Sequence, residues 1–350
     1  MTAPQTSNPF KAASRVVLAA IYFFLARILA HHGAQGLVSE DWLPLAEQAM
    51  FAFLLLLGYA GIGFSLDRQL HPISLQGLPR RSGWLGEAGM GLAIGWAIAV
   101  LCVLPMVFFG GIALHFSFTL VSFRWLIADA AFFALATLAI EIAFRGYPFQ
   151  RAIDAIGELP AVLLMSVLYG ILLAWLPNAS HASMAVNIVL GLLLAMAYLR
   201  TRALWLPWGL SFGWVASRAL LFGLPVNGIG NHSSVVQGYP MGPLALTGGD
   251  FGLEGTWLAF VVLLLALFFV YRATSDLSFI YNAPVLKPAG MPVDLDAAAK
   301  RQHETATRPE VPEVKPLVQI LPATPPPLPV ASDLDRPANP FNPRSNTPGS

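Results

Sequence analysis

Apolar stretches long enough to cross a membrane recur between residues 16 and 271 of this chain. A helix needs roughly 20 apolar residues to cross the ~30 Å hydrocarbon core, because lipid offers no partner for an unpaired backbone N–H or C=O group. The sequence predicts spans at roughly Val16–Ala30, Leu43–Phe64, Leu85–Phe109, Trp125–Phe144, Leu159–Trp175, Met184–Leu199, Leu204–Phe222 and Gly255–Tyr271. The first, fifth and sixth are short enough to be tilted, partly buried or re-entrant. With 56% hydrophobic and 11% charged residues, the chain is predicted to be an all-α polytopic membrane protein with about eight transmembrane helices.

The basic residues predict the orientation of these spans. Arginine and lysine concentrate in alternate connections, at Lys11, Arg15, Arg68, Arg80, Arg81, Arg145, Arg151, Arg200, Arg202 and Arg272. Arg124 is the one arginine in the intervening connections, and they hold no lysine. Because cytoplasmic loops carry the excess of positive charge, both termini are expected in the cytoplasm.

Composition divides the chain into three parts and limits the kinds of partner that it can bind. Residues 1–84 hold the first two spans and a cytoplasmic loop, residues 85–272 form the main membrane bundle, and residues 273–350 form a proline-rich tail that is expected to be disordered. The tail acts either as a plain tether or as a ligand for a partner with a polyproline-binding groove. A net charge of +1 argues against nucleic acid as a partner. Since Cys102 is the one cysteine, an intramolecular disulfide and a thiolate metal cluster are excluded.

Four ionisable residues are predicted at membrane depth: Asp129, Glu141, Arg145 and Arg218. Each costs at least ~2.5 kcal/mol to insert, so such residues indicate a functional site by default. Glu141 and Arg145 are four residues apart and therefore share one face of a helix. They form either a self-neutralising ion pair or part of a site. Gly91 and Gly95 in the third span have the GxxxG spacing that allows close helix packing.

The segment Ile140-Glu141-Ile142-Ala143-Phe144-Arg145-Gly146-Tyr147-Pro148-Phe149-Gln150 resembles the first motif of the CPBP family (CAAX-processing and bacteriocin-immunity, or Abi) of intramembrane metalloproteases. That family's pattern is Glu-Glu-x-x-x-Arg, then an aromatic residue and a histidine four residues later, then His-x-x-x-Asn or Asp. Tyr169 to Leu173 resembles the second motif, and the third is expected at Ser211 to Val215. The resemblance covers roughly residues 85–272 and implies a CAAX-protease-like core bundle.

The chain departs from the family at most of the positions that would carry catalysis. Ile140 replaces the first glutamate, Leu173 the first histidine, Ser211 the second histidine and Val215 the asparagine or aspartate, while Glu141 and Arg145 are retained. The resemblance implies a divalent metal such as zinc, but zinc needs about three imidazole, carboxylate or thiolate ligands, so no cofactor is expected. Of the histidines, only His71 and His303 are predicted on the cytoplasmic side that holds Glu141.

These observations leave three functions open. The first is a catalytically inactive relative, a pseudoenzyme that binds a membrane-protein or peptide partner. The second is an active intramembrane metalloendopeptidase with CAAX-type processing that uses Glu141. The third is a membrane scaffold that acts through the proline-rich tail. Truncation of the chain after Tyr271 would abolish only the third.

Overall fold

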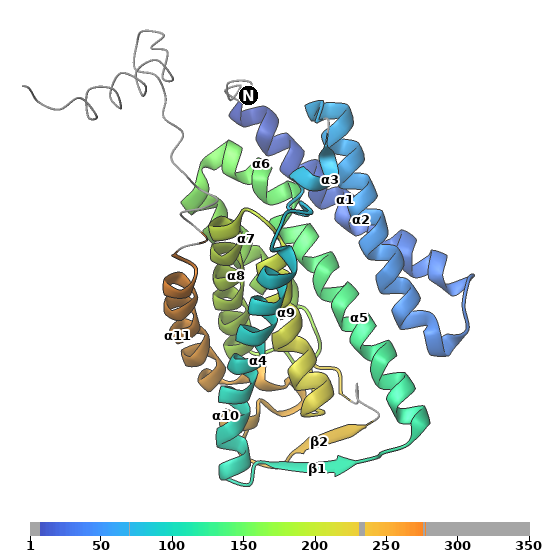
Figure 1. Ribbon diagram of the computed structural model, residues 1–350, viewed down its shortest axis with the longest axis vertical. Helices are drawn as coiled ribbons and strands as arrows, with labels where there is room; N and C mark the ends of the chain where they lie inside the picture. Colours follow the sequence, from blue (N-terminus) through green and yellow to red (C-terminus); the bar gives the residue numbers. More distant parts are fainter. Residues whose placement is uncertain (1–7, 70, 231–234, 276, 278–350) are drawn as a thin grey trace, which may run out of the picture. The chain divides into compact units, whose positions relative to one another are not determined.

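The computed structural model describes residues 8–69, 71–230, 235–275 and 277. Apart from its first residues, the tail predicted over residues 273–350 lies outside this part, as do its predicted disorder and His303. Long helices dominate the described residues (Figure 1). They are α1 (Pro9–Gln35), α2 (Leu43–Asp67), α4 (Trp84–Phe108), α5 (Leu120–Arg145), α7 (Glu158–Ala174), α8 (His181–Thr201), α9 (Trp205–Ala216) and α11 (Trp257–Ala273).

A helix therefore lies at each of the eight predicted spans, which confirms an all-α polytopic membrane protein. Within the described part, five helical stretches are long and apolar enough to cross a membrane: Pro9–Gln35, Glu40–Asp67, Trp84–Phe108, Leu120–Ile156 and His181–Thr201. Helices α7 and α11 are apolar but have 17 residues each, and α9 has 12. The number of crossings and the sidedness of the termini stay predictions.

Two helices predicted as short are longer than expected, because each begins at a capping residue in a polar stretch. Asn8 accepts a hydrogen bond from the backbone N–H of Phe10, and α1 then runs for 27 residues. Ser180 and Ser183 form a reciprocal capping box at the start of α8, which has 21 residues. Such caps satisfy the first free N–H groups of a helix, so a helix can begin before its apolar face does.

Helices α4 and α9 pack with their backbones in contact. A Cβ atom added to Gly91 would lie 2.3 Å from the carbonyl oxygen of Leu206, and one added to Gly95 would lie 2.2 Å from that of Leu210. On the facing helix, Gly209 and Gly213 approach the backbone of α4 equally closely. The predicted role of the GxxxG spacing in close helix packing is confirmed.

Shorter elements connect the long helices. They are the 3-10 helices at Glu40–Trp42, Gly249–Phe251 and Leu253–Gly255, the π-helical turn at Ser217–Leu221, and α3 (Pro72–Leu75), α6 (Tyr147–Ile156) and α10 (Leu244–Thr247). Strands β1 (Ile112–Phe116) and β2 (Val236–Pro240) pair antiparallel, with Ile112 opposite Pro240. The sequence did not predict this sheet, because its two strands are short and more than a hundred residues apart.

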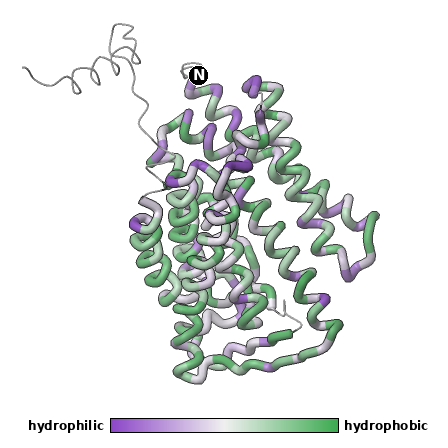
Figure 2. Tube along the Cα trace, in the orientation of Figure 1, coloured by the Kyte–Doolittle hydropathy of each residue, from purple (hydrophilic) through white to green (hydrophobic). Residues whose placement is uncertain are grey.

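The buried residues form two large clusters. One joins α4, α7, α8, α9 and α11 and contains Trp214 and Leu193, and the other joins α1, α2, α5, α6, α7 and α8 and contains Tyr59 and Phe149. Large apolar side chains are also exposed along the helices, and Figure 2 shows hydrophobic residues over most of their length. This exposed apolar surface fits a lipid bilayer.

Candidate functional site

Glu141 and Arg145 occupy the last two turns of α5 and form an ion pair. Arg145 Nη1 donates to Glu141 Oε1 at 3.1 Å, and both side chains are buried. Helix α5 ends directly after this pair, because Pro148 has no N–H to continue the hydrogen-bond pattern and its ring disfavours a continuous helix. At Gly146 a Cβ atom would lie 2.4 Å from the carbonyl oxygen of Ile142, so glycine is required at the turn into α6.

Two further groups hold the Arg145 guanidinium. Its Nη2 donates to the backbone carbonyl oxygen of Gly191 in α8 at 3.3 Å, and its Cζ lies 4.9 Å from the centre of the Tyr169 ring in α7. A cation over an aromatic face is attracted by the ring quadrupole. Arg145 therefore connects α5, which carries the first motif, with α8 and with α7, which carries the second.

The altered family positions lie on three helices, Ile140 on α5, Leu173 on α7, and Ser211 and Val215 on α9. Ile140, Leu173 and Val215 all pack against one buried cluster, although they come from three helices. Ser211 is buried, and its hydroxyl lies near the Glu141 carboxylate. Glu141 Oε2 accepts no hydrogen bond from any described residue. Ser211 of the expected third motif thus lies near Glu141 of the first.

The residues at this place do not fit the metal that the family implies. Leu173 and Val215 offer only carbon atoms, Ser211 offers a neutral hydroxyl, and Glu141 is bonded to Arg145. Zinc needs about three imidazole, carboxylate or thiolate ligands. No group of three His, Cys, Asp or Glu residues able to hold a metal occurs among the described residues.

Arg218, the predicted membrane-depth cation, belongs to a second buried ion pair. Its Nη2 donates to Glu254 Oε1 at 2.6 Å, its Nε donates to the carbonyl oxygen of Trp214 at 3.0 Å, and its Cζ lies 4.0 Å from the centre of the Trp214 ring. The Trp214 indole N–H also donates to Glu254 Oε1, at 3.1 Å. Arg218 lies in the π-helical turn, a local distortion that is frequent at functional sites.

Sequence reasoning missed Glu254 and Asn187. Glu254 directly precedes the last predicted span, Gly255–Tyr271, yet its side chain is buried against α9. Asn187 lies in the middle of α8 with no exposed surface, and within the described structure neither side-chain amide atom has a hydrogen-bond partner. A polar residue inside an otherwise apolar helix was the available signal for Asn187. For Glu254 the local sequence offered none.

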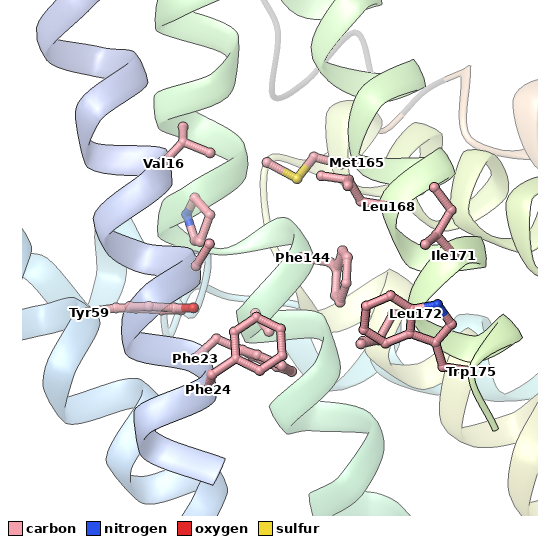
Figure 3. Close-up of a pocket in the computed structure, with 13 residues that line it drawn as sticks. Val16, Phe23, Phe24, Tyr59, Phe144, Met165, Leu168, Ile171, Leu172 and Trp175 are labelled. Carbon is pink, nitrogen blue, oxygen red and sulfur yellow. The ribbon is translucent and has the colours of Figure 1, made fainter. Parts of the chain in front are cut away.

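An apolar pocket of about 220 Å³ borders the site, between α1 on one side and α5 and α7 on the other (Figure 3). Phe23 and Phe24 line it from α1, and Met165 and Leu168 line it from α7. Phe144 lies between these two groups. Its ring packs edge-on against Tyr169, with centroids 5.4 Å apart. Phe144 and Tyr169 thus connect the pocket wall to the Arg145 guanidinium.

A family of known proteins resembles the part of the chain that carries the three motifs. Residues 122–217 match the family model described as type II CAAX prenyl endopeptidase Rce1-like. The match includes Ile140, Glu141, Arg145, Leu173, Ser211 and Val215. No curated protein and no solved structure matches the chain. Residues 122–217 are therefore similar to the Rce1-like type II CAAX prenyl endopeptidases, in line with the CPBP resemblance of the three motifs.

Proposed function

We propose that this protein is a non-catalytic CPBP-type membrane protein that binds a membrane-protein or peptide partner through its helical bundle. The observation that carries the proposal is the buried Glu141–Arg145 ion pair, together with the apolar side chains of Ile140, Leu173 and Val215 that pack against the bundle core. A metallopeptidase needs a metal held by about three ligands and an open position for water. By the resemblance, Leu173, Ser211 and Val215 stand where the family has two histidines and an asparagine or aspartate.

The contacts and burial of Glu141 also support a non-catalytic role. A general base must reach the proton that it removes, either directly or through one water molecule. Glu141 Oε1 is already bonded to Arg145, and the side chain is completely buried. A carboxylate in this position suits a structural role, in which it neutralises the buried Arg145, better than the role of a general base that activates a nucleophile.

The apolar pocket supports the binding part of the proposal. It is lined by side chains that are partly exposed on the outside of the bundle, including Phe24, Leu168 and Trp175. Grooves of this kind accept apolar side chains of a partner helix or peptide. Phe144 lines the pocket and contacts Tyr169, which in turn contacts Arg145. A partner bound in the pocket is therefore linked to the Glu141–Arg145 pair through a chain of direct contacts.

The metal content of the purified full-length protein in maltoside micelles tests the non-catalytic part. We expect the wild type, Glu141→Ala and the control Glu158→Ala, which changes an exposed carboxylate of α7, to hold equally little divalent metal. One metal per chain that is lost only in Glu141→Ala would overturn the proposal.

Photo-crosslinking in native membranes tests the binding part. A photoreactive residue at Leu168 in the pocket is expected to capture a discrete partner, whereas one at Leu264 in α11, which is similarly exposed, is not. Truncation after Leu277 keeps α11 complete and should leave this crosslink intact. Equal crosslinking at both positions, or loss on truncation, would contradict partner binding by the bundle.

An active intramembrane endopeptidase is the second candidate, and the match of residues 122–217 to an endopeptidase family model favours it. It requires ligands from outside the inferred set. His71 is the one described histidine predicted on the same side of the membrane as Glu141. In the metal measurement, a stoichiometric metal that is lost in both Glu141→Ala and His71→Ala would favour this candidate.

A further inference from the structure

A second pocket, of about 480 Å³, lies at a distance from the Glu141 site. It is bounded by the start of α2 with the 3-10 turn before it, by the first half of α5 and by Ile229 and Gly230. Asp129, in this half of α5, precedes Glu141 by twelve residues, or about 18 Å along a helix. The proposed partner-binding function does not involve this pocket.

Aromatic rings form much of the pocket wall. Trp42 comes from the turn before α2 and Trp125 from α5, and their ring centroids are 5.3 Å apart with an interplanar angle of 35°. Phe132, two turns after Trp125, also lines the pocket. The faces of aromatic rings carry negative potential and attract cations, tryptophan most strongly.

Asp129 supplies a carboxylate to this aromatic wall. It is partly buried in α5, and it forms no hydrogen bond or ion pair with another described residue. An unpaired carboxylate at membrane depth is costly, and such residues normally have a partner. Asp41 lies at the exposed rim, so the described residues of the lining include two carboxylates and no basic residue.

Arg124 is the nearest basic residue on α5, and it lies outside the lining. Its Cζ is 5.2 Å from the centre of the Trp125 ring, so Trp125 already accepts one cation on its ring. Neither Asp41 nor Asp129 is paired with this guanidinium among the described ion pairs. The carboxylate of Asp129 is therefore available to a ligand.

The lining favours an organic cation over a metal ion. Calcium takes six to eight oxygen ligands and zinc about four nitrogen, sulfur or oxygen ligands, whereas this pocket has two carboxylates and aromatic carbon. Aromatic rings beside a carboxylate are the usual recognition elements for ammonium and quaternary ammonium groups. The volume admits such a group with part of its substituents.

We propose that the Trp42–Trp125–Asp129 pocket binds an alkylammonium group, carried either by a membrane lipid headgroup or by a free amine. The trimethylammonium or ammonium group packs against the tryptophan rings and pairs with Asp129, while Asp41 attracts it at the rim. Trp42 and Trp125 both lie near helix starts, and tryptophans at helix ends are typical of the headgroup region of a bilayer. At this level of the bilayer the pocket is accessible both to a lipid headgroup and to a free amine.

Saturation-transfer NMR on the purified full-length protein in maltoside tests this proposal. The probes are choline and its uncharged isostere 3,3-dimethylbutan-1-ol, whose methyl resonances can be compared directly. We expect choline to bind at least about tenfold more tightly than the isostere, the factor set by loss of one desolvated cation contact. Equal binding of the two probes would overturn the proposal without any variant.

Variants then assign the binding to the pocket. Asp129→Asn keeps the shape of the side chain and removes its charge, and Trp42→Leu removes one ring. Both should reduce choline binding to the level of the isostere, while Trp257→Leu, which changes an exposed tryptophan at the start of α11, should not. Unchanged choline binding in a monodisperse Asp129→Asn sample would overturn the assignment.

Native mass spectrometry of protein released from mixed phosphatidylcholine and phosphatidylglycerol nanodiscs separates the two sources. Preferential retention of phosphatidylcholine that is lost in Asp129→Asn supports a lipid headgroup. Choline binding without a lipid preference supports a free amine.

Discussion

Arg145 Nη1 lies 3.1 Å from Glu141 Oε1, and the two side chains are 2% and 0% exposed. Two charges in such a place are costly to desolvate, and they are tolerated because they neutralise one another and Arg145 also bonds to Gly191. The pair is therefore expected to act as a unit. Removal of one member leaves the other charged and buried.

This coupling gives a test of direct pairing. Arg145→Ala should lower the free energy of unfolding by about 3–5 kcal/mol, the usual result of breaking a buried pair. The double variant Glu141→Ala/Arg145→Ala should lose less than the single variant, because no uncompensated carboxylate remains. The measurement is SDS-driven unfolding in mixed micelles. Equal losses in the single and double variants would argue against the pair.

The contact between α4 and α9 gives a second test with a matched control on one helix. Gly91→Ala places a Cβ atom 2.3 Å from the Leu206 carbonyl oxygen and 2.7 Å from the Leu210 nitrogen, so the helices must separate. We expect a loss of about 1–3 kcal/mol in unfolding free energy. At Gly89 an added Cβ meets nothing within 4 Å, and alanine should stabilise by up to about 1 kcal/mol through helix propensity. Similar effects at both positions would contradict backbone contact.

The features predicted correctly from sequence are those with a local signal. The spacing of Glu141 and Arg145 placed them on one helix face, with an ion pair as one of two alternatives. The spacing of Gly91 and Gly95 predicted close packing, and the apolar stretches predicted the positions of the long helices. Each of these patterns lies within a few turns of one helix. The geometry of a single helix is therefore enough to predict these features without knowledge of the tertiary packing.

The features that were missed depend on distant parts of the chain. Glu254 lies in a glycine-rich connection, and its partner Arg218 precedes it by 36 residues. The aromatic pocket joins Trp42 to Trp125, which are further apart still. No periodicity or spacing relates such residues, so their contacts become visible only when the helices are packed.

The Arg218–Glu254 pair gives a third prediction, which concerns the segment before α11. Because Glu254 bonds to both Arg218 and Trp214, it holds this segment against α9. Glu254→Ala should therefore increase the rate of protease cleavage between Gly249 and Gly255, as measured by mass spectrometry of the fragments. Local opening of a segment controls its cleavage when closing is fast.

Asp250→Ala is the matched control, since Asp250 lies in the same segment and is exposed. It should leave the cleavage rate unchanged. The double variant Arg218→Ala/Glu254→Ala should unfold less readily than Glu254→Ala alone, because it leaves no unpaired guanidinium in the bundle. Equal cleavage of the Glu254→Ala and Asp250→Ala proteins would show that the buried pair does not hold the segment.

The fourth prediction asks whether the bundle retains the shape of a metal site. Ser211 lies near Glu141, and Ile140, Leu173 and Val215 pack against one buried cluster. The combined variant Ile140→Glu/Leu173→His/Ser211→His/Val215→Asn supplies two imidazoles and a second carboxylate, which are ligands that zinc accepts. We expect this variant to bind about one zinc per chain, measured by elemental analysis after gel filtration.

The control moves one ligand by a single residue. Leu172 lines the apolar pocket, about 100° around α7 from Leu173 by helix geometry. With histidine at Leu172 instead of Leu173 and the other three changes kept, the ligands cannot converge, and zinc binding should fall by at least about tenfold, in line with loss of one ligand from a preorganised site. If both variants bind zinc equally, the metal is held by dispersed histidines, and the alignment of the three motifs around Glu141 is wrong. If only the first variant binds, the wild-type side chains at these four positions are what exclude a metal from the site.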